Sequence, residues 1–135
     1  MEVSDLILAD YAAIGERGKF TLVGAGFTEI ATFKLPCIHQ LMFLFVRLKV
    51  GIKDKGANRI AVRLVGEKGV LFKAEGQIDV KQDHQQEESV QLVFKFDNLK
   101  FESQGEYNFE VVVNGESKQN QILRIKHIEP QPIGQ

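Results

Sequence analysis

The stretch "EYNFEVVVNG", residues 106–115, decides the fold class because it joins strict alternation to a turn dipeptide. Every second residue is apolar, and these residues share one face: Tyr107, Phe109, Val111 and Val113. A period of two residues is typical of a β-strand with one buried face. Asn114-Gly115 then predicts a tight hairpin, since both residue types tolerate positive φ. We therefore expect a strand over residues 107–113 that pairs with a second strand over residues 119–125.

The same period of two recurs in three other long stretches. They are "LMFLFVRLKV" at residues 41–50, "NRIAVRLVG" at 58–66 and "SVQLVFKFD" at 89–97. Turn-forming residues separate the stretches, at 15–18, 51–58, 66–69, 97–98 and 104–105. The predicted inward faces are Met42, Leu44, Val46, Leu48 and Val50, then Ile60, Val62 and Leu64, then Val90, Leu92, Phe94 and Phe96.

Eight or nine such short strands, without a convincing helical period, predict an all-β protein. A lone sheet would leave one apolar face in water, so a second layer is required. We predict an antiparallel β-sandwich of immunoglobulin-like or related Greek-key topology, with a β-barrel as the alternative. The 135 residues, 44% of them hydrophobic, suit a single domain over residues 1–128. The segment 129–135, "EPQPIGQ", has no core pattern and is predicted to be a flexible tail.

The composition also narrows the expected partners and location. A formal charge of −1 supplies no general field that would hold a phosphate backbone, so nucleic acid is not an expected partner. One cysteine cannot form an internal disulfide. The first residues, "MEVSDLILADY", lack the positive charge of a signal peptide, and no stretch approaches the roughly 20 apolar residues of a membrane span. We therefore expect a cytoplasmic protein without a membrane partner.

Asp10 is a lone carboxylate in the small and apolar stretch "LILADYAAIGERGKFTLVG", residues 6–24. A four-residue loop "GERG" predicts a hairpin in which Tyr11 faces Leu22 and Asp10 faces Val23. The predicted core face is Ile7, Ala9, Tyr11, Ala13, Phe20 and Leu22, and the outer face is Leu8, Asp10, Ala12, Thr21 and Val23. On that face we expect Asp10 to accept a hydrogen bond or to pair with an arginine. The alternative is a catalytic or ligand-binding role. The run Gly24-Ala25-Gly26 beside it predicts a bulge or a close approach of two backbones.

The strand at residues 41–50 carries apolar residues on both faces. Outward from its predicted core side it has Leu41, Phe43 and Phe45, which a half-solvated strand should not expose. Leu6, Leu8, Val23 and Phe27 show the same surplus in the first hairpin. These seven residues could form an apolar patch that binds a second copy or an unknown protein partner. The alternative is that a loop of the same chain, such as residues 31–40, folds over them.

The sequence holds few groups arranged for chemistry. Cys37 and His39 are half of a zinc site, which His84, His127 or a carboxylate would have to complete. No serine lies in a nucleophile-elbow context, and "KQDHQQEES" at residues 81–89 is typical of a solvated loop. The outward cations are simply explained by pairing across strands with Glu110; they are Arg47, Lys49, Arg59, Arg63 and Lys95. We therefore predict no catalytic residues, no metal, no cofactor and no enzymatic activity.

The order of these features resembles a family of small, functionally uncharacterised bacterial proteins. The resemblance rests on "LILADYAAIGERGKFTLVGAGFTEI", on Pro36 before "FLFVRLKV", and on "GEYNFEVVVNGE", and it covers most of residues 3–128. It implies a cytoplasmic β-sandwich and no activity. Gly105 and Tyr107, a Gly-x-Tyr before a strand, also resemble the pattern of immunoglobulin-like sandwiches.

The function we predict is a protein-protein interaction or structural module. The alternative is a small-ligand or carbohydrate-binding module, with Tyr11, Asn58, Asn98 and Tyr107 as its mild candidate residues. A hydrolytic enzyme is the third hypothesis. The sequence shows no nucleophile and base at a spacing that would support it.

Overall fold

The computed structural model describes residues 1–81 and 88–130, and it is built almost entirely of strands. There are ten in this part of the chain: β1 (Glu2–Ala9), β2 (Tyr11–Ile14), β3 (Phe20–Val23), β4 (Glu29–Thr32), β5 (Cys37–Val50), β6 (Gly56–Gly66), β7 (Gly69–Val80), β8 (Glu88–Phe101), β9 (Gly105–Val113) and β10 (Glu116–His127). Two short 3₁₀ turns, η1 (Glu16–Gly18) and η2 (Ile52–Asp54), accompany them. None of the described residues form a helix with the length and apolar character needed to cross a membrane.

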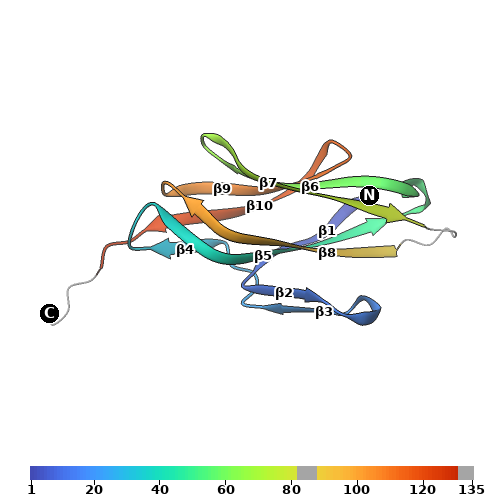
Figure 1. The fold of residues 1–135 in the computed structure, drawn as a ribbon, viewed down its shortest axis with the longest axis horizontal. Helices are drawn as coiled ribbons and strands as arrows, with labels where there is room; N and C mark the ends of the chain where they lie inside the picture. The colour runs from blue at the N-terminus through green and yellow to red at the C-terminus, as the bar shows by residue number, and fades with distance from the viewer. Residues whose placement is uncertain (82–87, 131–135) are drawn as a thin grey trace.

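Two main sheets pack face to face, which confirms the predicted β-sandwich (Figure 1). The smaller sheet has the order β1-β5-β8 and the larger one β4-β10-β9-β6-β7. All neighbours in them are antiparallel except β4 and β10, which run parallel. Neither sheet closes on itself, so the alternative of a barrel is wrong.

The core lies between the two sheets and is made by the alternating faces that the sequence predicts. Met42, Leu44, Val46 and Leu48 of β5 are fully buried, and so are the inward residues of β6 and β9. Phe96 of β8 packs on Phe109 of β9 with ring centroids 5.3 Å apart, which joins one sheet to the other. Burying an apolar side chain of this size stabilises a fold by about 1.5–3 kcal/mol, so these faces account for much of the stability.

The turn at Asn114-Gly115 is confirmed, and the turn predicted at Asp97-Asn98 is wrong. Asn114 and Gly115 have φ values of 50° and 81°, and Val113 pairs with Glu116 across the hairpin. β8 continues through residues 97–98 to Phe101, although Asn98 has a φ of 54°. Asparagine tolerates this left-handed conformation, so it is absorbed within a long strand instead of ending it.

Tyr107 anchors the place where the chain passes from one sheet to the other. Its hydroxyl donates a hydrogen bond of 2.6 Å to the carbonyl of Ser103, in the short connection between β8 and β9. Its ring lies edge-on to Phe101 at 5.0 Å. This is the geometry of the tyrosine corner found in Greek-key sandwiches.

The β2–β3 hairpin forms a third layer, outside the smaller sheet (Figure 1). The chain bends at Asp10, so β1 stays in the sheet beside β5 while β2 leaves it. This break, together with the short strand β4, is why ten strands are present where eight or nine are predicted.

The predicted register of this hairpin is wrong by one residue. Tyr11 pairs with Val23, not with Leu22, because the loop spans residues 15–19 and is closed by a hydrogen bond of 2.7 Å from Gly15 N to Lys19 O. The predicted face of β2 is inverted, since Ala12 is buried while Tyr11 is exposed, whereas Phe20 and Leu22 of β3 lie on the covered face as predicted. A shift of one residue moves every side chain to the opposite face.

Candidate functional site

The apolar outer face of β5 is covered by the chain's own hairpin. Tyr11 lies edge-on to Phe43 at 5.4 Å, and Phe20 stacks on Phe45 at 4.5 Å. The Arg47 guanidinium lies 4.8 Å from the centre of the Phe20 ring, a cation–π distance. Phe45 is 1% exposed. The alternative that a segment of this chain covers these residues is therefore correct, but the cover is β2–β3 and not residues 31–40.

Residues 31–40 have another role. They hold the end of β4, which runs along β10 at the margin of the larger sheet, and the start of β5. Their large apolar side chains Phe33 and Ile38 are mostly exposed.

Burial corrects the membership of the predicted apolar patch. Leu6 and Leu8 lie in the main core, because β1 pairs with β5 in a register that sets them opposite the inward residues Val46 and Leu44. Phe43 and Phe45 are buried under the hairpin, and Phe27 is half-buried against the core. Val23 and Leu41 alone among the seven are well exposed, at 53% and 39%.

Asp10 lies at the bend between β1 and β2, and its side chain is exposed. Its amide donates hydrogen bonds to the carbonyls of Val23 at 3.0 Å and Gly24 at 3.3 Å. Within the described residues its carboxylate has neither the arginine partner nor the hydrogen bond that we predict. The close backbone approach is confirmed: Gly26 N donates to Leu8 O at 2.8 Å, and a Cβ on Gly24 would overlap the Asp10 carboxylate.

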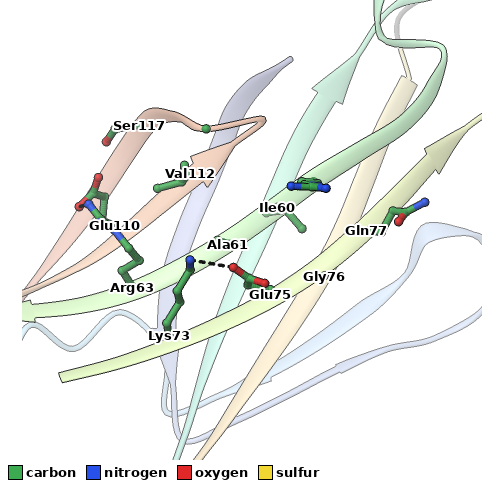
Figure 2. A pocket seen from close by; sticks show the side chains of 12 residues that line it. Ile60, Ala61, Arg63, Lys73, Glu75, Gly76, Gln77, Glu110, Val112 and Ser117 are labelled. Atoms are coloured by element: carbon green, nitrogen blue, oxygen red, sulfur yellow. Dashed lines mark hydrogen bonds and ion pairs between the residues drawn. The ribbon is translucent and has the colours of Figure 1, made fainter. Parts of the chain in front are cut away.

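The larger sheet has a different outer face, which forms a charged hollow of about 790 Å³ (Figure 2). Its floor is made of small or half-buried residues such as Ala61 and Val112. Its walls are charged side chains from β6, β7 and β9: Arg59, Arg63, Lys73, Glu75 and Glu110. We call this feature the charged hollow.

Two ion pairs line the charged hollow, one between β6 and β9 and one along β7. Arg63 Nη2 lies 2.8 Å from Glu110 Oε2, so the predicted cross-strand pairing with Glu110 is confirmed for Arg63, and Lys73 Nζ lies 2.7 Å from Glu75 Oε1. The predicted pairing is wrong for Arg47, which lies 3.1 Å from Asp5 Oδ2, and for Lys95, which lies 4.0 Å from Asp97 Oδ1. The hydrogen bond from Arg63 lowers the pKa of Glu110, with burial opposing it. The hydrogen bond from Lys73 likewise lowers the pKa of Glu75. Both carboxylates are therefore ionised at neutral pH. The walls of the charged hollow thus carry negative and positive side chains next to one another.

Two donors of the charged hollow are left over. The described residues place no carboxylate within ion-pair distance of the Arg59 guanidinium, although Arg59 contributes to the lowered pKa of Glu75. Arg63 Nε is buried and has no hydrogen-bond partner in the described structure. The two-residue pattern of the sequence explains these charges as the solvent-exposed face of the strands. The pattern therefore does not predict the charged hollow. The sequence feature that could have indicated a hollow is the pair of small residues between the charged ones, Ala61 and Gly76.

The half zinc site of Cys37 and His39 is not completed by any of the described residues. Cys37 and His39 lie opposite Phe101 and Leu99 on β8, and His127 Nε2 lies 3.0 Å from the Phe33 carbonyl. No cluster of three potential metal ligands occurs in residues 1–81 and 88–130. His84, and most of the polar stretch 81–89, lie outside the described residues, as does most of the predicted tail 129–135.

The mild ligand-binding candidates do not converge on one site either. Asn58 is buried, donates to the carbonyls of Asp54 at 2.7 Å and Gly56 at 3.1 Å, and accepts from Asn114 at 2.9 Å. Its side chain is thus occupied in holding the turns together. Tyr107 is occupied in the same way by Ser103.

The fold and these two surfaces define a β-sandwich protein with a hairpin layer on one outer face and a charged hollow on the other. Residues 4–126 match the model of the family of unknown function DUF6941, and the chain belongs to that family. The predicted resemblance to an uncharacterised family is thereby confirmed, while a bacterial source stays a prediction. No curated protein matches the chain.

Proposed function

We propose that the protein is a protein-interaction module of the cytoplasm and has no enzymatic activity. Its docking surface is the exposed apolar group Tyr11, Val23 and Leu41, which we call the hairpin surface. The observation that carries the proposal is the exposure of these residues, 47% and 53% for Tyr11 and Val23 on the layer that covers Phe43 and Phe45, and 39% for Leu41 on β5 itself.

The three residues of the hairpin surface are connected through the β2–β3 pairing and through Phe43. Tyr11 and Val23 pair across β2 and β3, and Tyr11 contacts Phe43, which lies on the same face of β5 as Leu41. Tyrosine supplies apolar area at a small cost in conformational entropy and is enriched in protein interfaces. A cluster of exposed apolar residues needs an explanation that single exposed residues do not. The occupant that fits is a folded protein with an apolar patch of its own.

A photo-crosslinking amino acid at position 23, in cells that express the protein, tests the proposal. We expect one dominant crosslinked protein, whose purified form binds the wild-type chain directly. Val23→Lys should weaken that binding at least about tenfold, because it places a charge in an apolar contact. Ile52→Lys is the matched control, since Ile52 is also 53% exposed but lies on the η2 turn. Equal binding by the two variants would contradict the proposal.

The charged hollow favours a second candidate function, the binding of a small acidic molecule. The Arg59 guanidinium and Arg63 Nε, which have no acidic or hydrogen-bonding partner among the described residues, are donors that a carboxylate or phosphate would satisfy. A carbohydrate is less well supported, because the described residues that line the hollow include no aromatic side chain. A thermal-shift screen with dicarboxylates and phosphorylated metabolites tests it, since a ligand that binds only the folded state raises the melting temperature. The shift should vanish in Arg59→Ala and persist in the control Lys95→Ala.

A further inference from the structure

β7 is a long strand at the open margin of the larger sheet. It runs for 12 residues, pairs with β6 on one side, and has no strand on its other side within the described part of the chain. An edge of this kind presents unpaired backbone N–H and C=O groups, which are a template for another strand. Apart from Gly69 at its start, β7 has no residue of positive φ, so the edge is regular from Phe72 to Val80.

We propose that two copies of this chain pair antiparallel through β7, with the two-fold axis at Ala74. In that register each residue i faces residue 148 − i of the second copy, so Lys73 faces Glu75 and Phe72 faces Gly76. The contact is self-complementary, as a two-fold interface requires. It does not depend on the hairpin surface, which lies on the other sheet.

The charges of β7 fit this register. Lys73 and Glu75 point to the same outer face, and more than half of each side chain is exposed. Antiparallel pairing at Ala74 sets a lysine opposite a glutamate twice, and opposite charges across strands are favourable. Parallel pairing in register would set lysine against lysine and glutamate against glutamate, which is unfavourable.

The apolar side of β7 fits the same register. Phe72 is 39% exposed, with its ring edge-on to Phe96 at 5.3 Å, so it lies at the open margin of the core. Gly76 sits in the middle of a strand, yet a Cβ there would meet only Ile60 Cγ2 at an ordinary 3.6 Å. The chain's own packing therefore does not require a glycine. A glycine inside a strand often marks the close approach of another group, and an aromatic ring across the ladder covers it well.

β8, one of the two edge strands of the smaller sheet, lacks this fit. β8 carries a similar pair, Lys95 and Asp97, 4.0 Å apart. The next residue, Asn98, has a φ of 54°, which distorts the backbone of that edge directly beside the charged pair. Such distortions protect edge strands from pairing. β8 therefore supplies a matched control for β7.

Pairing through β7 would make one continuous sheet from the two larger sheets. Lys73, Glu75 and Gln77, which form the β7 wall of the charged hollow, would then lie beside the same wall of the second copy (Figure 2). Two hollows would become one longer charged surface.

Sedimentation velocity over a range of concentrations tests the pairing. We expect the wild-type chain to reach twice the mass of one chain, Lys73→Glu to dissociate at least about tenfold more readily, and the double change K73E/E75K to restore the dimer. Lys95→Glu should dimerise as the wild type does. A wild-type chain that stays monomeric at about 100 µM, where weak edge-to-edge interfaces form, would overturn the proposal. So would a Lys73→Glu variant that dimerises normally.

A disulfide at the axis tests the register. Residues that face each other in an antiparallel pair have Cα atoms about 4.5–5.5 Å apart, within the range of a disulfide. Ala74→Cys should therefore form a crosslinked dimer under mild oxidation, in a Cys37→Ser background. Gln77→Cys should not, because two copies of residue 77 would lie about 20 Å apart along the ladder. Crosslinking of Gln77→Cys in preference to Ala74→Cys would contradict the register.

Discussion

The outer faces of the two sheets arise from the same alternating pattern but differ in what covers them. The smaller sheet carries Phe43 and Phe45 outward, and a hairpin of the same chain folds over them. The larger sheet carries Arg63, Lys73 and Glu110 outward, and that face stays open as the charged hollow. The comparison teaches that the polarity of the outward face, and not the two-residue pattern of the strands, decides whether a further layer covers a sheet.

The largest expected effect comes from removing a ring under the hairpin. Phe45→Ala should destabilise the fold by about 3–5 kcal/mol, since Phe45 is fully buried and stacked on Phe20. Val112→Ala, on the floor of the charged hollow, should cost less than about 1 kcal/mol. Chemical denaturation of the two variants measures the difference. Equal losses would mean that the two faces are not distinct.

The next effect comes from disturbing the point where the hairpin leaves the sheet. Gly24→Ala should cost about 1–3 kcal/mol, because Gly24 has a φ of 58° and its new Cβ would overlap the Asp10 carboxylate. Hydrogen exchange should show the amides of residues 11–23 opening more than those of β9. Gly26 also has a positive φ, but a Cβ there would meet open space. Gly26→Ala therefore measures the backbone strain alone, without the overlap with a carboxylate. A smaller loss in Gly24→Ala than in Gly26→Ala would contradict the account.

A smaller effect belongs to the open face and depends on pH. Glu110→Gln should cost about 0.2–1 kcal/mol near neutral pH, as expected of a partly exposed ion pair. The hydrogen bond from Arg63 lowers the pKa of folded Glu110 below 4.5, so protonation favours the unfolded chain. The contribution is therefore fully present above pH 4.5 and is lost as the pH falls through the folded pKa. Urea titrations of both proteins from about pH 7 to pH 3 should show their stabilities converging in acid.

The smallest expected effect is that of Val23→Lys on stability. Val23 is on the exposed side of the hairpin, so the change should fall within about 0.5 kcal/mol. Thermal denaturation measures it. A large loss would mean that Val23 belongs to the sealed layer, and its effect on binding could no longer be assigned to the hairpin surface.

Much of the sandwich was predictable because burial on one face imposes a period of two. The inward faces of β5, β6 and β9 and the turn at Asn114-Gly115 follow from local residue chemistry. Asn98 shows the limit of such reasoning, since a turn-forming residue is carried inside β8 by the long ladder with β5. Cross-strand pairing along residues 37–50 outweighs the local preference of a single residue.

The candidate sites were less predictable because they depend on which segments meet. The sequence identifies the surplus of apolar residues around Phe43 and Phe45, but a one-residue change in loop length decides which face of β2 seals them. The register of β1 with β5 places Leu6 and Leu8 in the core, away from the patch in which we placed them. The charged hollow is lined by residues of β6, β7, β9 and β10, so no single strand encodes it.

The most direct measurement of the central claim is proton–proton contact between the aromatic rings of the hairpin and those of β5 in solution. The account predicts nuclear Overhauser effects between Tyr11 and Phe43 and between Phe20 and Phe45, whose ring centres lie 5.4 Å and 4.5 Å apart. Absence of both, with the amides of residues 11–23 exchanging as fast as an unfolded chain, would contradict it. Phe43 and Phe45 would then be an open surface, and the hairpin would not be their cover.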